Sequence, residues 1–347
     1  MPRTRLLPIL CLVAALLAGC QATDHRYPFG RPETFILWPP PPAEPQIRYL
    51  GSLAGSADVG SDGSWWEAIV GRKAFPLVKP YGLSVDAEGT VYVADRGAHC
   101  VHLLNPSRHE YRRIERVGGT AFDTPVGVAA AEPGRLYVTD PGLQEVFALD
   151  REGNLLFRLG DGWEFDRPSG IAVDPRTREV YICDARKDCV VVMNEQGKYL
   201  RHFGGRGSEK GGLNFPTNLC LGRDGLVYVS DSMNFRVQIF KPDGTFVDTF
   251  GTQGDASGYF CRLTGIAGDS QGHLFTVDTL FETVQIFDRQ GRFLLAFGET
   301  GKGPGQFNLP SGIFIDPRNR IYVADTHNSR VQVFEFLGDP QALKGKP

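Results

Sequence analysis

The chain of 347 residues has little excess charge, no c-type haem motif, and an N-terminal apolar run too short to cross a membrane. Its formal net charge is −3, with both signs interspersed, so the basic footprint of a nucleic-acid-binding protein is absent. No Cys-x-x-Cys-His sequence occurs, which gives no support for covalent haem attachment. The apolar run at residues 6–18 has 13 residues, whereas a spanning helix needs about 20. The 42 Gly and 24 Pro predict many turns and few long helices.

The N-terminus has the features of a targeting segment. Arg3 and Arg5 precede the apolar run, which ends in Leu17-Ala18-Gly19-Cys20 and resembles a bacterial lipobox. We therefore predict that residues 1–19 are a lipoprotein signal peptide and that Cys20 is lipidated, anchoring the protein in the bacterial cell envelope. The absence of Asp at position 21 favours the outer membrane. The alternative is an ordinary secretory cleavage site with an incidental cysteine.

Residues 20–46 are predicted to be the lipidated cysteine followed by a Pro-rich stalk. Pro39 to Pro42 must be extended, because proline fixes φ and biases the preceding residue out of the helical region. The apolar run from Phe35 to Trp38 leaves a second interpretation open, in which these residues pack on the folded domain and the stalk is shorter.

One phrase recurs six times at nearly constant spacing. It reads Pro-x-Gly-φ-x-φ-Asp, a turn, then φ-Tyr-Val-x-Asp, where φ is apolar, and its clearest copy spans residues 310–325. Successive copies are 44–47 residues apart, a period typical of a repeat architecture. The final Asp of each copy, here called the closing aspartate, occurs at Asp95, Asp140, Asp184, Asp231, Asp278 and Asp325.

Each repeat contains four short strand signals, so we predict an all-β, six-bladed β-propeller at residues 47–347. The sixth copy has only three strand signals, ending at residues 331–336. The sequence at 47–53 resembles the missing fourth strand, so we predict that this N-terminal strand pairs with residues 331–336 and closes the ring. Residues 54–79 form an insertion in which Ser64-Trp65-Trp66-Glu67 fits a capping box and predicts a short helix.

The repeats beginning at Asp231 and Asp325 resemble the NHL repeat, and the Phe-Gly pairs at 203–204, 250–251 and 297–298 fit its blade ends. The resemblance spans about residues 47–336 and is strongest in blades four and six. It implies a non-catalytic scaffold that binds a protein or ligand. Cys100 and Cys189 replace the usual Arg in blades one and three.

The closing aspartates are predicted to be structural rather than catalytic. An Asp at a strand end can accept hydrogen bonds from the N–H groups of the next turn, and an Arg five residues later can bridge it. Cys183 and Cys189 bracket a hairpin turn, so we predict a disulfide between them, with free buried thiols as the alternative.

The turns that follow the closing aspartates carry varied side chains on a constant frame, as a recognition surface requires. Exposed Met, Phe and Leu among them favour a protein or peptide partner. The alternative is that these turns accept any side chain and form no recognition surface. The candidate binding residues are Arg96, His99, Gln144, Arg186, Lys187, Met233, Phe235, Leu280, Phe281 and His327.

Three functions remain open, and we predict no cofactor and no metal. The first is an envelope lipoprotein that binds a protein or peptide without catalysis. The second is an enzyme, because propellers similar to this one include metal-dependent lactonases and peptidyl-amide lyases. Its channel candidate is Asn218, which stands where other blades have Gly; His99 and His327, on equivalent turns, are a weaker pair of metal ligands. The third is an accessory subunit of an envelope electron-transfer complex.

Overall fold

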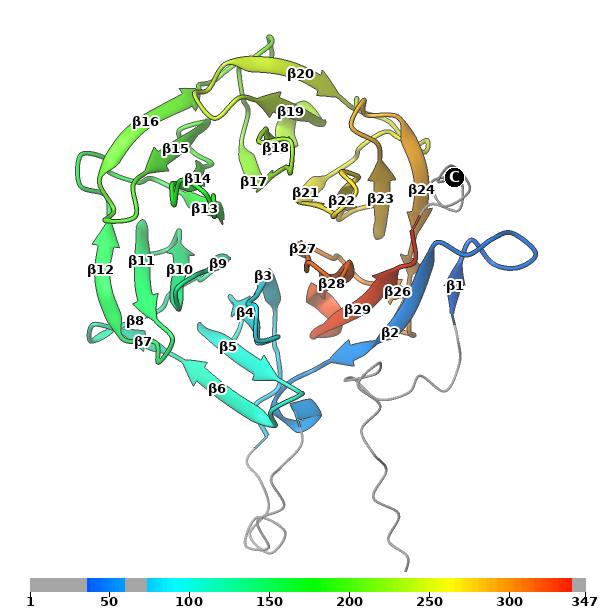
Figure 1. Ribbon diagram of the computed structural model, residues 1–347, viewed down its shortest axis with the longest axis horizontal. Coiled ribbons are helices and arrows are strands. Elements are labelled where there is room, and N and C mark those ends of the chain that lie inside the picture. Colours follow the sequence, from blue (N-terminus) through cyan, green and yellow to red (C-terminus); the bar gives the residue numbers. More distant parts are fainter. Residues whose placement is uncertain (1–35, 60–73, 339–347) are drawn as a thin grey trace, which may run out of the picture.

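A computed structural model describes residues 36–59 and 74–338 of the chain. Six four-stranded antiparallel sheets surround a central axis, and each is one blade (Figure 1). Blade one comprises β3 (Pro80–Val85), β4 (Val91–Asp95), β5 (Cys100–Asn105) and β6 (Glu110–Ile114). Blade two comprises β9 (Gly127–Ala131), β10 (Arg135–Asp140), β11 (Glu145–Asp150) and β12 (Leu155–Leu159). Blade three comprises β13 (Pro168–Val173), β14 (Val180–Asp184), β15 (Cys189–Met193) and β16 (Tyr199–Gly204).

The remaining blades follow the same order, with the first strand nearest the axis. Blade four comprises β17 (Pro216–Leu221), β18 (Val227–Asp231), β19 (Arg236–Phe240) and β20 (Phe246–Phe250). Blade five comprises β21 (Leu263–Gly268), β22 (Leu274–Asp278), β23 (Thr283–Phe287) and β24 (Phe293–Phe297). Blade six comprises β27 (Ile313–Ile315), β28 (Arg320–Asp325), β29 (Arg330–Phe336) and β2 (Ile47–Leu53). The predicted all-β six-bladed propeller is confirmed.

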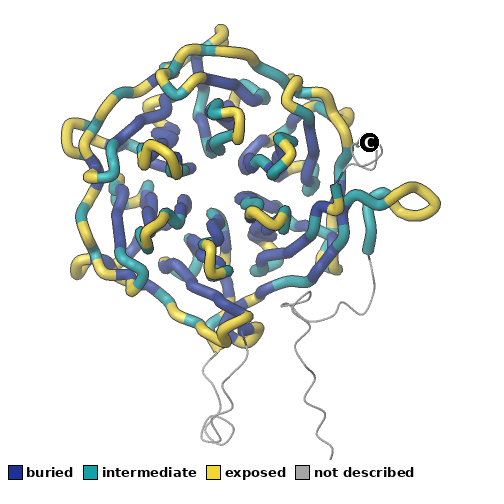
Figure 2. Tube along the Cα trace, viewed as in Figure 1, coloured by how far each residue is buried: buried dark blue, intermediate teal, exposed yellow. Residues whose placement is uncertain are grey.

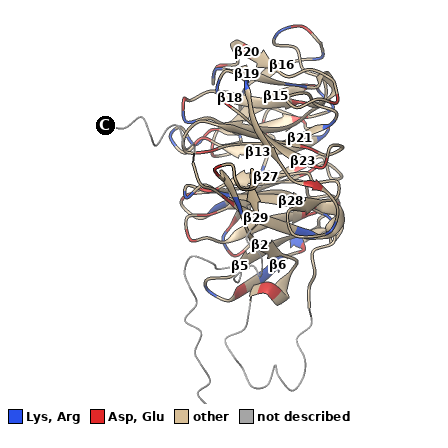
Figure 3. Ribbon diagram, turned by 90° about the vertical axis from the view of Figure 1, so that its right-hand side faces the viewer, with Lys and Arg blue, Asp and Glu red and all other residues tan. Residues whose placement is uncertain are grey.

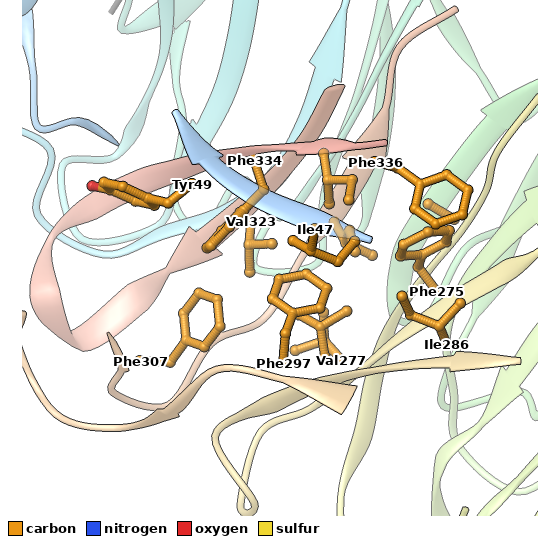
Figure 4. Close-up of a cluster of buried hydrophobic side chains, with 14 residues drawn as sticks. Ile47, Tyr49, Phe275, Val277, Ile286, Phe297, Phe307, Val323, Phe334 and Phe336 are labelled. Atoms are coloured by element: carbon orange, nitrogen blue, oxygen red, sulfur yellow. The ribbon is translucent and has the colours of Figure 1, made fainter. Parts of the chain in front are cut away.

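The ring closes as the sequence predicts. Strand β2 pairs antiparallel with β29, from Ile47 opposite Phe336 to Leu53 opposite Val331. Ile47 is fully buried in a cluster with Phe297 and Phe334, so the N-terminal strand contributes to the core of blade six (Figure 4). Because residues 47 and 336 are far apart in sequence, this pairing joins the two ends of the propeller.

A further short strand, β1 (Leu37–Trp38), continues the sheet of blade six beyond β2. The Trp38 ring lies 5.8 Å from the ring of Phe334 and 5.9 Å from that of Phe297. Ile36 packs on the same cluster. Of the two interpretations of the segment after Cys20, packing against the domain therefore applies to residues 36–38.

The remaining described elements are short and connect blades or turns. They are β7 (Arg116–Val117), β8 (Thr120–Ala121), β25 (Glu299–Thr300), β26 (Gln306–Phe307) and the 3₁₀ turns η1 (Ser56–Val59), η2 (Ser232–Asn234) and η3 (Thr326–Asn328). No helix among the described residues is long and apolar enough to cross a membrane. The helix predicted from Ser64, Trp65 and Trp66 lies outside the described residues.

Burial follows the position of a strand within its blade. Second strands such as β4 and β14 are buried throughout, because neighbouring blades cover both faces of each sheet. Outer strands such as β6 alternate between exposed and covered residues, as expected for a sheet edge with one solvated side. Figure 2 shows the resulting gradient from buried blade interiors to exposed turns and rim.

Antiparallel strands place the turns on two opposite faces of the disc. We call one the 2–3 face, because it carries the turns between second and third strands: 96–99, 141–144, 185–188, 232–235, 279–282 and 326–329. We call the other the 1–2 face, because it carries the turns between first and second strands: 86–90, 132–134, 174–179, 222–226, 269–273 and 316–319. Acidic and basic residues are interspersed over the molecule (Figure 3).

Candidate functional site

The closing aspartates are buried anchors for the 2–3 face. Asp278 shows the arrangement: its carboxylate accepts backbone N–H groups from Cys261 and Arg262 in the preceding loop and from Leu280 and Phe281 in the following turn, at 2.7–3.1 Å. All six carboxylates are fully buried, and each accepts at least one backbone N–H from the loop that enters its blade. Their predicted structural role is confirmed.

Two of these carboxylates also hold an arginine. Arg236 Nε donates to Asp231 at 2.8 Å, and Arg330 Nε donates to Asp325 at 2.7 Å. Arg330 donates in addition to two loop carbonyls, so its guanidinium ties the loop to the strand. The predicted bridge from the Arg five residues later is therefore present in blades four and six.

Blade one replaces this arginine with a Cys–His pair. The Nε2 atom of His102 lies 3.5 Å from Asp95 Oδ2 and 3.3 Å from Cys100 Sγ, and its Nδ1 lies 2.9 Å from the Tyr111 hydroxyl. Burial tends to raise the pKa of Asp95, but hydrogen bonds from His102 and backbone N–H groups outweigh it and hold the pKa at about 2. Burial and the nearby Asp95 charge raise the pKa of Cys100 to about 12, so this thiol is not a nucleophile at neutral pH.

The charged members of the predicted binding face are engaged locally. Arg186 forms an ion pair with Asp166 at 3.2 Å, and the Lys187 ammonium lies 4.6 Å from the centre of the Trp163 ring. In blade one, the Arg96 guanidinium lies 4.9 Å from the Tyr81 ring centre, and His99 hydrogen-bonds to the Asp123 carbonyl. These side chains therefore already have partners within the propeller.

The apolar members lie together in blades four and five and are less engaged. Met233 and Leu280 occupy the same position, two residues after their closing aspartates, and are 55% and 51% exposed. Phe235 and Phe281 in the same turns are half-buried, and Tyr259 in the loop between the two blades is 40% exposed. We call these five residues the apolar patch.

The backbone beneath the varied side chains is constant. The last residue of every 2–3 turn has φ between +52° and +58°, in the left-handed region. These residues are His99, Gln144, Asp188, Phe235, Glu282 and Ser329. The 2–3 face thus combines a fixed turn conformation with varied side chains, and its role as a recognition surface stays a prediction.

The predicted Cys183–Cys189 disulfide is wrong, because both thiols are free and buried. In the β14–β15 ladder, Cys183 is opposite Val190 and Cys189 is opposite Asp184. Paired residues share a sheet face and successive residues alternate, so the two thiols point to opposite faces. Cys189 packs between blades two and three, whereas Cys183 packs between blades three and four.

The two histidines proposed as weaker metal ligands do not converge on a third donor. His99 is the last residue of its turn, whereas His327 is the second residue of its own, so their side chains occupy different positions. Among residues 36–59 and 74–338, no group of three or more His, Cys, Asp or Glu side chains could hold a metal ion.

The glycines of the first strands are required by close packing around the axis. A Cβ atom on Gly265 would lie 2.5 Å from the Ser311 carbonyl oxygen, and one on Gly312 would lie even closer to the Tyr81 carbonyl oxygen. In the five blades that have Gly at this position, the first strand thus approaches the next blade too closely for a side chain. The repeated Gly is therefore explained by close packing at the channel wall, and it provides no side chain for a reaction.

Asn218 is the exception in this ring, and it lines a central channel of about 260 Å³. Its Oδ1 atom accepts the backbone N–H of Leu219 at 2.9 Å, and its Nδ2 atom has no partner among the described residues. The wall around it is formed by glycines and apolar side chains such as Ile171 and Ile266. Hydroxyls and the Cys220 thiol complete the polar lining, and no Asp, Glu, His, Lys or Arg occurs among the described residues that line this channel.

A larger cavity opens on the 1–2 face, which the sequence analysis did not consider. This cavity, here called the funnel, has a volume of about 510 Å³ and shares Ala130, Val173, Leu221, Phe314 and Ile315 with the channel wall. Its size lies within the range of small-molecule sites. The funnel and the channel therefore adjoin each other along these shared residues.

A second set of carboxylates shapes the funnel rim. Asp86 accepts the N–H of Thr90 at 2.8 Å and the hydroxyl of Tyr92 at 3.0 Å, and Asp224 accepts the hydroxyl of Tyr228 at 2.7 Å. The recurring Tyr of the phrase is thus explained, because it ties the second strand to the 1–2 turn. The recurring Asp after the first strand was the available sequence signal for this face.

Two predicted features lie outside the described residues: the lipidated Cys20, and the Trp65-Trp66 segment of the insertion. The described parts of the insertion are η1 and residues 74–79. Here the backbone N–H of Leu77 donates to the Ala54 carbonyl at 2.8 Å.

A family model for the NHL repeat matches residues 77–102, 213–240 and 307–334, in blades one, four and six. Among curated proteins, the gluconolactonase of Zymomonas mobilis is 24% identical over 164 residues, covering 44% of this chain and 46% of that protein. The peptidylglycine alpha-amidating monooxygenase of Rattus norvegicus is 29% identical over 134 residues, covering 34% of this chain and 13% of that protein. The chain thus spans less than half the length of these curated relatives.

Solved structures share the fold at low identity. A streptogramin B lyase has a TM-score of 0.58 at 14% identity, covering 75% of this chain and 94% of that one. The hydrazine synthase of Kuenenia stuttgartiensis has a TM-score of 0.55 at 13% identity, and the match covers 81% of this chain and 100% of that one. An auxiliary nutrient binding protein from Bacteroides thetaiotaomicron has a TM-score of 0.59 at 14% identity, and the match covers 74% of this chain and 69% of that one. At these identities the likeness shows the fold alone.

Proposed function

We propose that this chain, a six-bladed β-propeller containing NHL repeats, is a non-catalytic binding protein of the bacterial cell envelope that presents its 2–3 face to a protein or peptide partner. The apolar patch carries the proposal. Met233 and Leu280 are more than half exposed at equivalent positions of adjacent blades, on turns held rigidly by buried carboxylates. An exposed apolar cluster on a rigid frame is the usual character of a protein-binding surface.

The chemistry of the channel supports binding rather than turnover. The repeated aspartates already accept several hydrogen bonds each, and the Cys100 pKa is raised rather than lowered. A hydrolase or lyase needs an acid, base or nucleophile that can reach substrate. The described lining of the channel contains hydroxyls, the Cys220 thiol and the Asn218 amide, and no Asp, Glu, His, Lys or Arg side chain.

The proposed lipid anchor at Cys20 rests on the sequence Leu17-Ala18-Gly19-Cys20. Because Ile36 packs on blade six and Leu37 pairs with Arg48, the proposed tether between the anchor and the propeller consists of residues 21–35. At 3.3–3.6 Å per residue, fifteen residues reach at most about 54 Å. The propeller would then stay close to the membrane, and outer-membrane proteins are the expected class of partner.

Chemical crosslinking in cells that express the protein at its normal level tests this proposal. The wild-type protein should capture specific envelope proteins, and the double variant Met233→Lys/Leu280→Lys should lose them. Arg318→Gln, an exposed residue of the 1–2 face, is the matched control and should capture the same proteins. Recovery of nonspecific background alone by the wild type would count against the proposal.

A second candidate is a propeller hydrolase or lyase with a metal in the channel, and the similarity to a gluconolactonase and to a peptidylglycine alpha-amidating monooxygenase favours it. Asn218 is then the residue that could contribute a ligand from the channel wall. Purified protein that hydrolyses gluconolactone, with the activity abolished by a chelator and restored by a divalent metal, would support this candidate. Loss of that activity in Asn218→Gly would assign it to the channel.

A further inference from the structure

The funnel on the 1–2 face contains apolar surface and uncommitted positive charge. Val173, Leu221, Phe314 and Ile315 line it and remain only partly covered. Apolar side chains that stay partly exposed inside a concave site gain free energy when an apolar ligand covers them. These residues therefore suit a ligand with an apolar body.

The acidic groups around the funnel already have partners. Asp174 pairs with Arg176, Asp269 hydrogen-bonds to His273, and Asp316 pairs with Arg320. Asp86 and Asp224 accept tyrosine hydroxyls, as described above. Glu132 lies 3.4 Å from Arg151, a weak and largely exposed pair.

Three of the five arginines that line the funnel are engaged as well. Arg135 donates to the Glu195 carbonyl at 2.7 Å, Arg178 pairs with the Glu195 carboxylate at 3.2 Å, and Arg151 pairs with Glu88 at 2.5 Å. Arg223 and Arg289 differ from these, because neither has a side-chain partner among the described residues. Both are exposed.

These two arginines lie on the same side of the funnel. Arg223 belongs to the 1–2 turn of blade four, and Arg289 belongs to blade five. The Arg289 charge acts on Tyr228 of blade four, so its guanidinium lies near the boundary between the two blades. It also lies directly over Gly272, where a Cβ atom would collide with it. Two unpaired guanidinium groups beside an apolar cavity form a site for an anionic group.

We propose that the funnel is a second binding site, which takes a small amphipathic anion with its apolar body in the cavity and its carboxylate or sulfonate on Arg223 and Arg289. Guanidinium groups bind such oxyanions through charge-assisted hydrogen bonds. The site lies on the face opposite the apolar patch, so a ligand in the funnel leaves the 2–3 face free for its partner.

Two fluorescent probes of matched shape test the site in the purified mature protein. They are 8-anilinonaphthalene-1-sulfonate and its uncharged counterpart N-phenyl-1-naphthylamine, which lacks the sulfonate. Arg223→Gln/Arg289→Gln should weaken the sulfonate about tenfold and leave the uncharged probe unchanged. Arg186→Gln, an exposed arginine of the 2–3 face, is the matched control and should change neither affinity.

A second variant tests the cavity itself. Ala131→Trp places a large side chain in the funnel and should weaken both probes, with circular dichroism confirming that the variant is folded. The proposal is overturned if the wild type does not enhance sulfonate fluorescence, or if the double arginine variant binds the sulfonate within twofold of the wild type. Unchanged binding of both probes by folded Ala131→Trp would overturn it too. None of these outcomes depends on the crosslinked partner.

Discussion

The two faces of the propeller are built from similar turns but differ in how their carboxylates are held. On the 2–3 face, each closing aspartate is fully buried and accepts a backbone N–H from the loop that enters its blade, and Asp278 also accepts N–H groups from the following turn. On the 1–2 face, the carboxylates cap single hairpin turns and accept tyrosine hydroxyls around an open funnel. The first arrangement holds the loops and turns of the 2–3 face in place and the second forms the rim of the funnel, so the same residue type supports two kinds of surface.

The largest expected effect is the loss of stability when a buried closing aspartate is removed, compared with the loss when an exposed Asp–Arg pair is removed. Asp325→Ala removes the acceptor for the largely buried Arg330, whose side chain is 13% exposed, and for Asn328 and Gln332. Leaving these donors unpaired should lower the free energy of unfolding by about 3–5 kcal/mol, measured by urea denaturation. The matched change Asp288→Ala also removes an Asp–Arg pair, but Arg292 is 77% exposed, so about 0–1 kcal/mol is expected. Equal losses in the two variants would contradict the contrast between the faces.

The channel wall that joins the two faces should be nearly as sensitive. Gly312→Ala forces a Cβ atom onto the Tyr81 carbonyl oxygen, where blade six meets blade one, and should cost about 2–3 kcal/mol. Asn218→Gly at the equivalent position of blade four only removes a side chain, and should cost no more than about 1 kcal/mol. The unfolding free energies of the two variants are compared by thermal unfolding. If Gly312→Ala is as stable as the wild type, the first strands can move apart to make room for the Cβ atom.

Acid should destabilise the 2–3 face through protonation of Asp95. Its folded pKa of about 2 is below the ordinary aspartate value, so its stabilising contribution is full above about pH 4 and is lost as the pH falls through 2. The gap between the ordinary value of 3.8 and the folded pKa of about 2 corresponds to about 2.5 kcal/mol of unfolding free energy, of which about 2 kcal/mol is lost between pH 4.5 and pH 2. Urea titrations at pH 4.5 and pH 2 should show that Asp95→Asn loses less stability on acidification than the wild type, by about that amount. If the wild type and Asp95→Asn lose the same stability between pH 4.5 and pH 2, protonation of Asp95 is not the cause of the loss.

Much of the fold could be predicted because the repeated phrase has strict positional requirements. Gly265 and Gly312 must lack side chains, and Asp278 must accept four N–H groups, so the pattern is visible in the sequence. The pairing of residues 47–53 with 331–336 could be predicted too, because the last repeat has only three strand signals. The Cys183–Cys189 prediction failed because spacing across a hairpin was considered without the alternation of sheet faces.

The functional surfaces were less accessible to sequence analysis. The funnel exists only after six distant 1–2 turns are brought together by ring closure, and no single turn indicates it. The predicted binding face was identified by its varied residues, but the sequence could not show that Arg186 and Lys187 have local partners whereas Met233 and Leu280 do not. That difference depends on loops such as the one carrying Trp163 and Asp166.

The smallest effects on stability are expected at the surfaces that we propose to be functional. Met233→Lys/Leu280→Lys and Arg223→Gln/Arg289→Gln change exposed side chains and should each alter the unfolding free energy by at most about 0.5 kcal/mol per substitution. The first double variant should lose only the protein partner of the 2–3 face, and the second should lose only anion binding in the funnel. Urea denaturation of both double variants checks that they are folded.

Quantitative crosslinking with mass spectrometry in the native envelope is the most direct test of the central claim, that this propeller acts by binding through its 2–3 face. We expect the wild type and Arg223→Gln/Arg289→Gln to recover the same envelope protein, and Met233→Lys/Leu280→Lys to recover at least tenfold less of it. Equal recovery by all three proteins would show that the apolar patch does not bind the partner.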